Sequence, residues 1–152
     1  MKRLLLTAHA PSENTALLLD SARAGVKEFG HGLELIEKPP LSVEAEDLLT
    51  ADGLLLGSLE NIGALAGLTK DMFDRCYHDW LDKKPGLPVA VYIRAGLDGT
   101  ASKRQIEAII TAQKWRLIDQ PLILKGAWQP AFEKSTAELA AALAAGMEAN
   151  IF

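Results

Sequence analysis

Short apolar runs alternate with longer segments of helical periodicity along the whole chain. The apolar runs predict five strands, near Arg3–Ala8, Leu33–Glu37, Leu54–Gly57, Leu87–Ile93 and Ile118–Leu124. The run at Leu54–Gly57 has no polar residue, as expected of a strand that is covered on both faces. The pattern therefore favours a sheet that lies between two layers.

The segments between these runs predict five helices, at Thr15–Phe29, Ser42–Leu49, Leu65–Leu81, Ala101–Lys114 and Ala131–Ala149. The third helix has the clearest period. Its apolar stripe comprises Leu65, Leu68, Met72, Phe73, Cys76, Tyr77, Trp80 and Leu81. Regular alternation of strand and helix predicts right-handed βαβ units, and hence a three-layer α/β domain over residues 1–152 with a parallel sheet.

A common strand order for a doubly wound, five-stranded parallel sheet is 2-1-3-4-5, which we expect here. Ligands bind such sheets beyond the carboxyl ends of the strands, where the order reverses between strands 1 and 3. Three segments follow the strands at that edge: His9–Asn14, Ser58–Leu65 and Arg94–Thr100. These three loops are the candidate ligand site.

Composition narrows the possible functions. The formal net charge of −4, with no basic stripe, argues against a nucleic-acid partner. Cys76 is the only cysteine, so an internal disulfide and a thiolate metal cluster are both excluded. The run Leu4–Leu6 is too short to span a membrane. We find no metal-ligand cluster and no nucleophile elbow, and we expect a cytoplasmic protein without a membrane partner.

The first loop has the chemistry of an anion cradle. Ser12, Asn14 and Thr15 lie at the start of a predicted helix, where unpaired amides and the positive end of the helix dipole favour a phosphate. Ser12 or Asn14 could equally serve only as a helix cap, which contributes about 1 kcal/mol. The residues alone leave both interpretations open.

The second and third loops are rich in glycine, which allows a planar ligand to approach the backbone closely. Gly57, Gly63 and Gly67 surround the second loop, and Gly96 and Gly99 lie in the third. Glycine also follows strands simply because turns require it. The presence of three such loops around one predicted crevice favours a ligand.

Three motifs resemble known proteins. Ala10–Thr15 resembles a phosphate loop that leads into a helix, Ala51–Ser58 resembles an Ala-Asp-Gly strand ending in Gly-Ser, and Gly67–Arg75 resembles the helix start that follows that strand. In order and spacing the chain resembles the flavodoxin-like fold family, and within it the NAD(P)H-dependent FMN reductases and related small flavoproteins.

The resemblance implies that FMN is the cofactor. Ser12, Asn14 and Thr15 would hold its phosphate, Leu59–Gly63 would line the isoalloxazine ring, and the third loop would approach the other side of the ring. The complete set of implied cofactor-binding residues is His9, Pro11, Ser12, Asn14, Thr15, Ser58, Leu59, Glu60, Asn61, Ile62, Gly63, Ala95, Gly96 and Asp98.

One dipeptide departs from the family pattern. Leu59-Glu60 stands where relatives usually have proline and an aromatic residue. The missing ring removes a stacking surface worth about 1 kcal/mol. We expect the Glu60 carboxylate to lie beside the flavin, where it would disfavour anionic reduced flavin and weaken binding.

Several other residues invite a functional interpretation. His9 is more readily explained as a solvated turn residue than as a ligand contact, and Cys76 as a buried, inert thiol. Trp80 belongs to the predicted core. Trp115 and Trp128 flank the fifth strand. For Trp128, both a place near the ligand mouth and a rim or dimer contact are open.

The leading functional hypothesis is an FMN-binding oxidoreductase that takes hydride from NADH or NADPH and passes electrons to a small acceptor such as a quinone or free flavin. It needs no acid–base residue, because the cofactor carries the redox chemistry. The alternatives are a flavodoxin-type electron carrier, which the modest charge disfavours, and a protein-binding module that has lost FMN, which Leu59-Glu60 favours. A homodimer is compatible with each.

Overall fold

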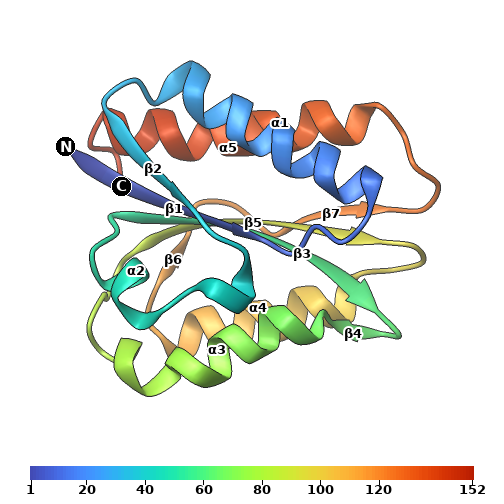
Figure 1. Ribbon diagram of the computed structural model, residues 1–152, viewed down its shortest axis with the longest axis horizontal. Coiled ribbons are helices and arrows are strands. Elements are labelled where there is room, and N and C mark those ends of the chain that lie inside the picture. The colour runs from blue at the N-terminus through green and yellow to red at the C-terminus, as the bar shows by residue number, and fades with distance from the viewer.

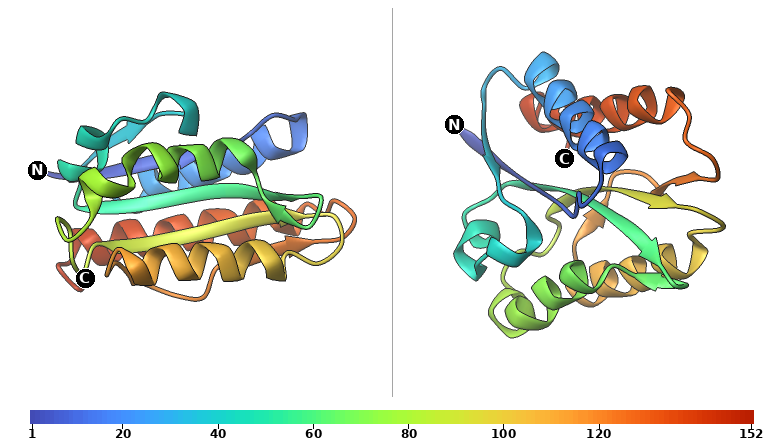
Figure 2. Two further views of the ribbon diagram at one scale, coloured as in Figure 1. Left: turned by 90° about the horizontal axis from the view of Figure 1, so that it is seen from below. Right: turned by 45° about the vertical axis from the view of Figure 1, so that its right-hand side comes forward.

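Two layers of helices cover the two faces of one central sheet (Figure 1). The computed structural model describes all residues, 1–152. Helices α1 (Glu13–Phe29) and α5 (Ala131–Glu148) pack side by side on one face, and α3 (Gly67–Trp80) and α4 (Thr100–Ala112) cover the other. The right-hand view of Figure 2 shows the same two helical layers on either side of the sheet. The three-layer α/β prediction is confirmed.

The order of the parallel strands is also confirmed. The strands are β1 (Lys2–Ala8), β2 (Leu33–Glu37), β3 (Gly53–Asn61), β5 (Pro88–Ala95), β6 (Arg116–Leu117) and β7 (Leu122–Lys125). They pair in the order β2-β1-β3-β5, with β6 and β7 both on the outer side of β5. The order reverses between β1 and β3, so the carboxyl ends of these strands bring the three expected loops to one edge.

The predicted fifth strand, Ile118–Leu124, forms only from Leu122 onward, as β7, and a separate short strand, β6, precedes it. Pro88 pairs with Arg116 and Tyr92 pairs with Leu122, so four steps along β5 correspond to six along the outer strand. The two additional residues of the outer strand have no partners in β5, so the pairing is interrupted between β6 and β7. Pro121 lies in the interruption and has no N–H to donate to a strand ladder.

The predicted helix at Ser42–Leu49 is shorter than expected. The segment begins with a 3₁₀ turn, η1 (Pro40–Ser42), and its α-helical part is α2 (Ala45–Leu49). Ser42 does not cap α2. That helix starts instead after Glu44, whose amide donates to the Asp47 carboxylate at 2.8 Å.

A hairpin replaces most of the predicted second loop. Strand β3 continues through Asn61 and returns as the short antiparallel strand β4 (Ala64–Leu65). The turn residues Ile62 and Gly63 have φ values of 52° and 71°, and two positive φ values are typical of a type I′ turn. The second wall of the candidate site is thus a β-hairpin rather than an irregular loop.

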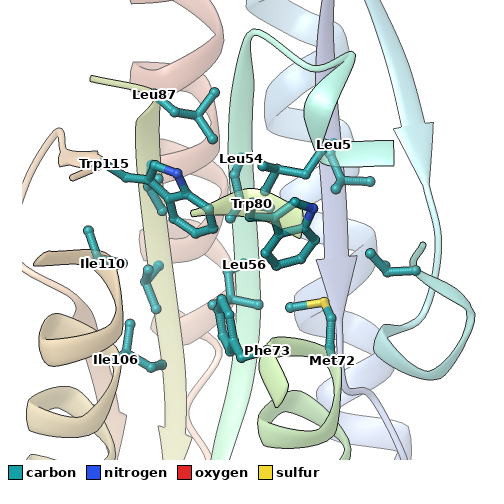
Figure 3. Packing of buried hydrophobic residues seen from close by; sticks show 14 of the residues in the cluster. Leu5, Leu54, Leu56, Met72, Phe73, Trp80, Leu87, Ile106, Ile110 and Trp115 are labelled. Carbon is teal, nitrogen blue, oxygen red and sulfur yellow. The ribbon is translucent and has the colours of Figure 1, made fainter. Parts of the chain in front are cut away.

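A cluster of mainly aliphatic side chains, with Phe73, Trp80 and Trp115 among them, fills the core between the sheet and α3 and α4 (Figure 3). The ring centroids of Trp80 and Trp115 lie 5.7 Å apart, and Phe73 meets Trp80 edge-on at 6.2 Å. Trp115 is only 6% exposed and belongs to this core, although the sequence placed it only beside the fifth strand. The Trp80 indole N–H donates to the Ala45 carbonyl at 2.9 Å, which satisfies its one polar atom.

Cys76 lies in the same core and is 3% exposed, as expected from its place on the apolar stripe of α3. Burial raises the pKa of its thiol, and a protonated thiol is a poor nucleophile. Leu68, which was expected on that stripe, is 39% exposed, whereas its neighbour Thr69 is the buried residue of the first turn of α3.

Candidate functional site

A cleft of about 270 Å³ lies at the carboxyl ends of β1, β3 and β5, where sequence analysis placed the ligand site. Its walls come from the segment before α1, from the β3–β4 hairpin and from the segment after β5. The lining residues are Ser12, Asn14, Thr15, Leu59, Glu60, Asn61, Arg94 and Gly96. The three segments expected from the strand order therefore converge on one concave surface.

Seven of the implied cofactor-binding residues line this cleft, namely Ser12, Asn14, Thr15, Leu59, Glu60, Asn61 and Gly96. The others, which lie outside the lining, are His9, Pro11, Ser58, Ile62, Gly63, Ala95 and Asp98. Two larger hollows, of about 570 and 550 Å³, contain no residue of the first or third loop. The hollow of about 550 Å³ lies between α3 and α4, with Ala64 and Leu65 of the hairpin in its lining, whereas that of about 570 Å³ contains no residue of the three loops.

The first turn of α1 is organised by a reciprocal cap. The hydroxyl of Ser12 accepts the amide of Thr15 at 3.2 Å, and the hydroxyl of Thr15 accepts the amide of Ser12 at 2.9 Å. The two hydroxyls also contact each other at 2.8 Å. Thr15 is buried, so its hydroxyl serves mainly to fix the helix start, which is the capping function left open by the sequence.

The donors that remain free at this turn are backbone amides. Those of Glu13 and Asn14, the first two of α1, have no acceptor within the chain. They lie at the positive end of the helix dipole, beside the exposed Asn14 side chain that lines the cleft. This turn can accept an anion, although the Glu13 carboxylate opposes the attraction.

His9 leads into the same turn. Its amide donates to the Gly57 carbonyl at 3.0 Å, which extends the pairing of β1 with β3 by one residue. Burial lowers the pKa of its imidazole. A lowered pKa favours the neutral ring, so His9 is not a fixed positive charge for a phosphate.

Ser58 differs from the expectation of a cleft residue. Its side chain is buried, and its hydroxyl contacts that of Thr69 at 2.8 Å on the α3 side of the sheet. Ala95 is buried as well. Because side chains alternate between the two faces of a strand, the extension of β3 through Asn61 turns Ser58 toward the core.

Glu60 is held by α4. One carboxylate oxygen accepts the amide of Gly99 at 3.0 Å, and the other accepts the amide of Ser102 at 2.9 Å. These bonds, with that of Ser102 the stronger influence, keep the pKa of Glu60 below its usual value despite partial desolvation. Glu60 lines the cleft as expected, but its ionised carboxylate is not free, because both of its oxygens are hydrogen-bonded to amides at the start of α4.

Arg94 lines the cleft but was not among the residues singled out from the sequence. Its guanidinium donates to the carbonyls of Ala95, Leu124 and Gly126 at 2.6, 3.0 and 2.6 Å. It forms no ion pair with a carboxylate, so its positive charge is fixed in place without being neutralised. The sequence feature that could have identified Arg94 is its place directly after a predicted central apolar strand.

The same guanidinium lies over two aromatic rings. Its central carbon is 5.0 Å from the Phe132 ring centroid and 6.0 Å from that of Trp128. Trp128 is half-buried and packs edge-on against Phe132. Trp128 is not part of the cleft lining, and its ring is connected to the cleft only through its contact with Arg94.

Two large apolar side chains project into solvent from the loops beside the cleft. Ile62, at the tip of the hairpin, is fully exposed, and Leu97, in the segment after β5, is 93% exposed. A positive φ is unfavourable for a β-branched residue such as Ile62. Neither position is explained by packing within the chain.

Other classes of site have little support in the structure. No group of three or more His, Cys, Asp or Glu side chains converges in a way that could hold a metal ion. No helix combines the length and apolar character needed to cross a membrane.

Comparison with known proteins places the fold. Neither a model of a known protein family nor a curated protein matches the sequence. Among solved structures, the chain is similar to a flavodoxin from the domain Archaea, with a TM-score of 0.78, 14% identity and coverage of 95% of this chain and 96% of the other. It is also similar to Flavodoxin 2 from Bacillus cereus, with a TM-score of 0.72, 23% identity and complete coverage of both chains.

A third similar structure is an oxidoreductase from Corynebacterium diphtheriae, with a TM-score of 0.68, 18% identity and coverage of 95% of each chain. In each of the three structures the similarity covers at least 95% of this chain. The chain therefore has the flavodoxin-like fold.

Proposed function

We propose that this protein binds FMN in the cleft and acts as an oxidoreductase, taking hydride from NADH or NADPH and passing electrons to a small acceptor such as a quinone or free flavin. The observation that carries the proposal is the convergence of three segments at the switch point of a flavodoxin-like sheet, with two unpaired helix amides at one end.

The phosphate end of FMN fits the first turn of α1. The free amides of Glu13 and Asn14 and the Asn14 side chain provide donors from one side, and the Ser12 hydroxyl lines the same wall. Hydrogen bonds to a charged group contribute about 1.5–3 kcal/mol each. These donors therefore suffice for specific phosphate recognition without a lysine or arginine at the turn.

The ring end fits the space between the hairpin and the segment after β5. The cleft volume of about 270 Å³ is slightly below the range of roughly 300–1,000 Å³ that is usual for enclosed ligand sites. A flavin ring would therefore remain partly exposed at the mouth. Side chains added at Gly63 or Gly96 would meet no atom within 4 Å, so the backbone there is open to a planar ligand.

When bound, FMN would supply hydride acceptance and electron transfer. The chain's own residues would bind and orient it. The fixed positive charge of Arg94 lies in the lining and would favour a ligand that gains negative charge, whereas the Glu60 charge is already engaged by α4. No acid–base residue is required, because the cofactor would carry the redox chemistry.

A flavodoxin-type electron carrier is the second candidate. It is favoured by the flavodoxins among the similar structures. A carrier would exchange electrons with protein partners and would not oxidise a nicotinamide nucleotide directly. A partner-binding module without FMN is the third candidate, and the exposed Ile62 and Leu97 beside the cleft would serve it.

Two measurements on the purified protein distinguish the three candidates. Fluorescence titration of FMN tests binding, and the FMN-loaded protein is then mixed with NADH or NADPH and a benzoquinone acceptor. Binding with turnover supports the oxidoreductase, and binding without turnover supports the carrier. A folded protein that leaves FMN fluorescence unchanged would refute both redox functions. Sedimentation of the same sample tests the expected homodimer.

A further inference from the structure

Glu60 connects two segments that enclose the cleft. Its carboxylate accepts the amides of Gly99 and Ser102, which lie 39 and 42 residues further along the chain. Gly99 is the N-cap residue of α4, and it has no side chain with which to cap that helix. The capping acceptor is therefore supplied by the hairpin, across the tertiary structure.

The local sequence of α4 cannot supply this cap. Gly99 has a φ of 87°, which side-chain-bearing residues rarely adopt, and an added Cβ would lie 2.7 Å from Cγ2 of Ile123. A serine or asparagine at position 99 would consequently be strained. The start of α4 thus depends on an acceptor from outside the helix, and Glu60 provides it.

A second contact attaches the other strand of the hairpin to the same helix. The amide of Leu65 in β4 donates to the Gln105 side chain in α4 at 2.8 Å. Glu60 secures β3 and Gln105 secures β4, while Ile62 occupies the strained turn between them. Strained backbone persists where the surrounding structure fixes it, and these two contacts do so here.

We propose that Glu60 is a positioning residue that locks the β3–β4 hairpin to the start of α4 and so fixes the spacing between the two segments, 61–63 and 96–99, that would enclose the flavin ring. This inference rests on the proposed binding of FMN. The lock does not include the first turn of α1, so it acts on the ring end of the site and not on the phosphate end.

The first test needs no ligand. Amide hydrogen exchange is measured for the wild type, Glu60→Ala, Glu60→Gln and the control Glu107→Gln, which removes a carboxylate of α4 that forms no hydrogen bond or ion pair. We expect the Gly99 and Ser102 amides to exchange about tenfold faster or more in Glu60→Ala. Glu60→Gln keeps one acceptor oxygen and the shape of the side chain, so its exchange rates at these two amides should lie between those of the wild type and Glu60→Ala.

The second test separates the two ends of the site. FMN and riboflavin affinities are measured by fluorescence titration, and orthophosphate is measured as a competitor of FMN. In Glu60→Ala we expect FMN and riboflavin to weaken by the same factor of about ten, which corresponds to about 1.4 kcal/mol, while the orthophosphate constant stays unchanged. Glu60→Gln should recover part of the loss, and Glu107→Gln should bind as the wild type does.

Several results would overturn the inference. Unchanged exchange at Gly99 and Ser102 in both Glu60 variants would show that the lock is absent in solution. Faster exchange with unchanged flavin affinity would show that it does not position the ring, and an equal loss of orthophosphate affinity would show a general structural effect. A wild type that binds neither FMN nor riboflavin would refute the proposed function itself, whatever the exchange rates show.

Discussion

The phosphate site can be tested at a single backbone amide. Glu13 is the first residue of α1, and its amide has no acceptor within the chain. Proline is well tolerated at this position, because its missing N–H is unpaired in any helix and its φ suits the first turn. Ser12 is already extended, with φ −122° and ψ 166°, as a residue before proline should be. Glu13→Pro therefore removes one phosphate donor without disturbing the helix.

The substitution also removes a negative charge, so Glu13→Ala is the matched control. Losing the carboxylate should strengthen phosphate binding in both variants by about 0.3–1 kcal/mol, the usual size of a charge effect in the first turn. Losing the amide should cost about 1.5–3 kcal/mol in Glu13→Pro alone. Relative to Glu13→Ala, we expect FMN to bind Glu13→Pro roughly tenfold to a hundredfold more weakly.

Fluorescence titration with FMN and with riboflavin, which has no phosphate, measures the effect. Riboflavin should bind both variants equally, and circular dichroism should show an unchanged helix content. Equal FMN affinity in the two folded variants would refute the assignment of the phosphate to this turn. A parallel loss of riboflavin affinity would indicate a distorted site rather than a missing donor.

Further predictions concern other parts of the site and the core. Asn14→Ala should weaken FMN, but not riboflavin, by about 1 kcal/mol or more in the same titration, because it removes a side-chain donor from the lining. Cys76→Ser should lower the free energy of unfolding by about 1–3 kcal/mol in urea, since it buries a hydroxyl in the core, and FMN affinity should stay unchanged. Arg94→Met should lower the midpoint potential of bound FMN, because a fixed positive charge leaves the lining; an unchanged potential would place the ring away from Arg94. The pKa of Glu60 is lower in the folded state than the value of about 4.3 in the unfolded state, so its ionised carboxylate stabilises the fold fully above about pH 4.3. This stabilisation is lost as the pH falls through the lower folded pKa. In acid denaturation, the free energy of unfolding of Glu60→Gln should therefore lack this part of the pH dependence.

The layers and the sheet order could be predicted because they depend on long, repeated patterns. Apolar runs between amphipathic segments define βαβ units wherever they occur, and the strand order then places the ligand edge. The placement of Ser12, Asn14 and Gly96 around one cleft follows from that order. No contact between distant residues had to be known.

The hairpin and the Glu60 lock could not be predicted for the opposite reason. Gly57 looks like the end of a strand, and isoleucine is an unfavourable residue for the positive φ of a type I′ turn. The Glu60 contacts join residues that are far apart in the sequence, and no local pattern marks an acid as the cap of a distant helix. Resemblance to relatives with an aromatic ring nearby pointed instead to the ligand.

The separation of β6 from β7 and the burial of Trp115 depend on similar tertiary detail. A single apolar run was compatible with one continuous strand, and only the register against β5 reveals the two additional residues. Trp115 lies between α4 and β6 and packs in the core against Trp80 of α3, which is distant in the sequence. Periodicity within one segment carries no information about such a neighbour.

The binding of FMN to the purified wild-type protein tests the central claim most directly. Fluorescence titration should show saturable binding of one FMN per chain, with a lower affinity for riboflavin and competition by orthophosphate. A folded protein that fails to bind FMN at any concentration, or that binds FMN and riboflavin equally without competition by orthophosphate, would contradict the account.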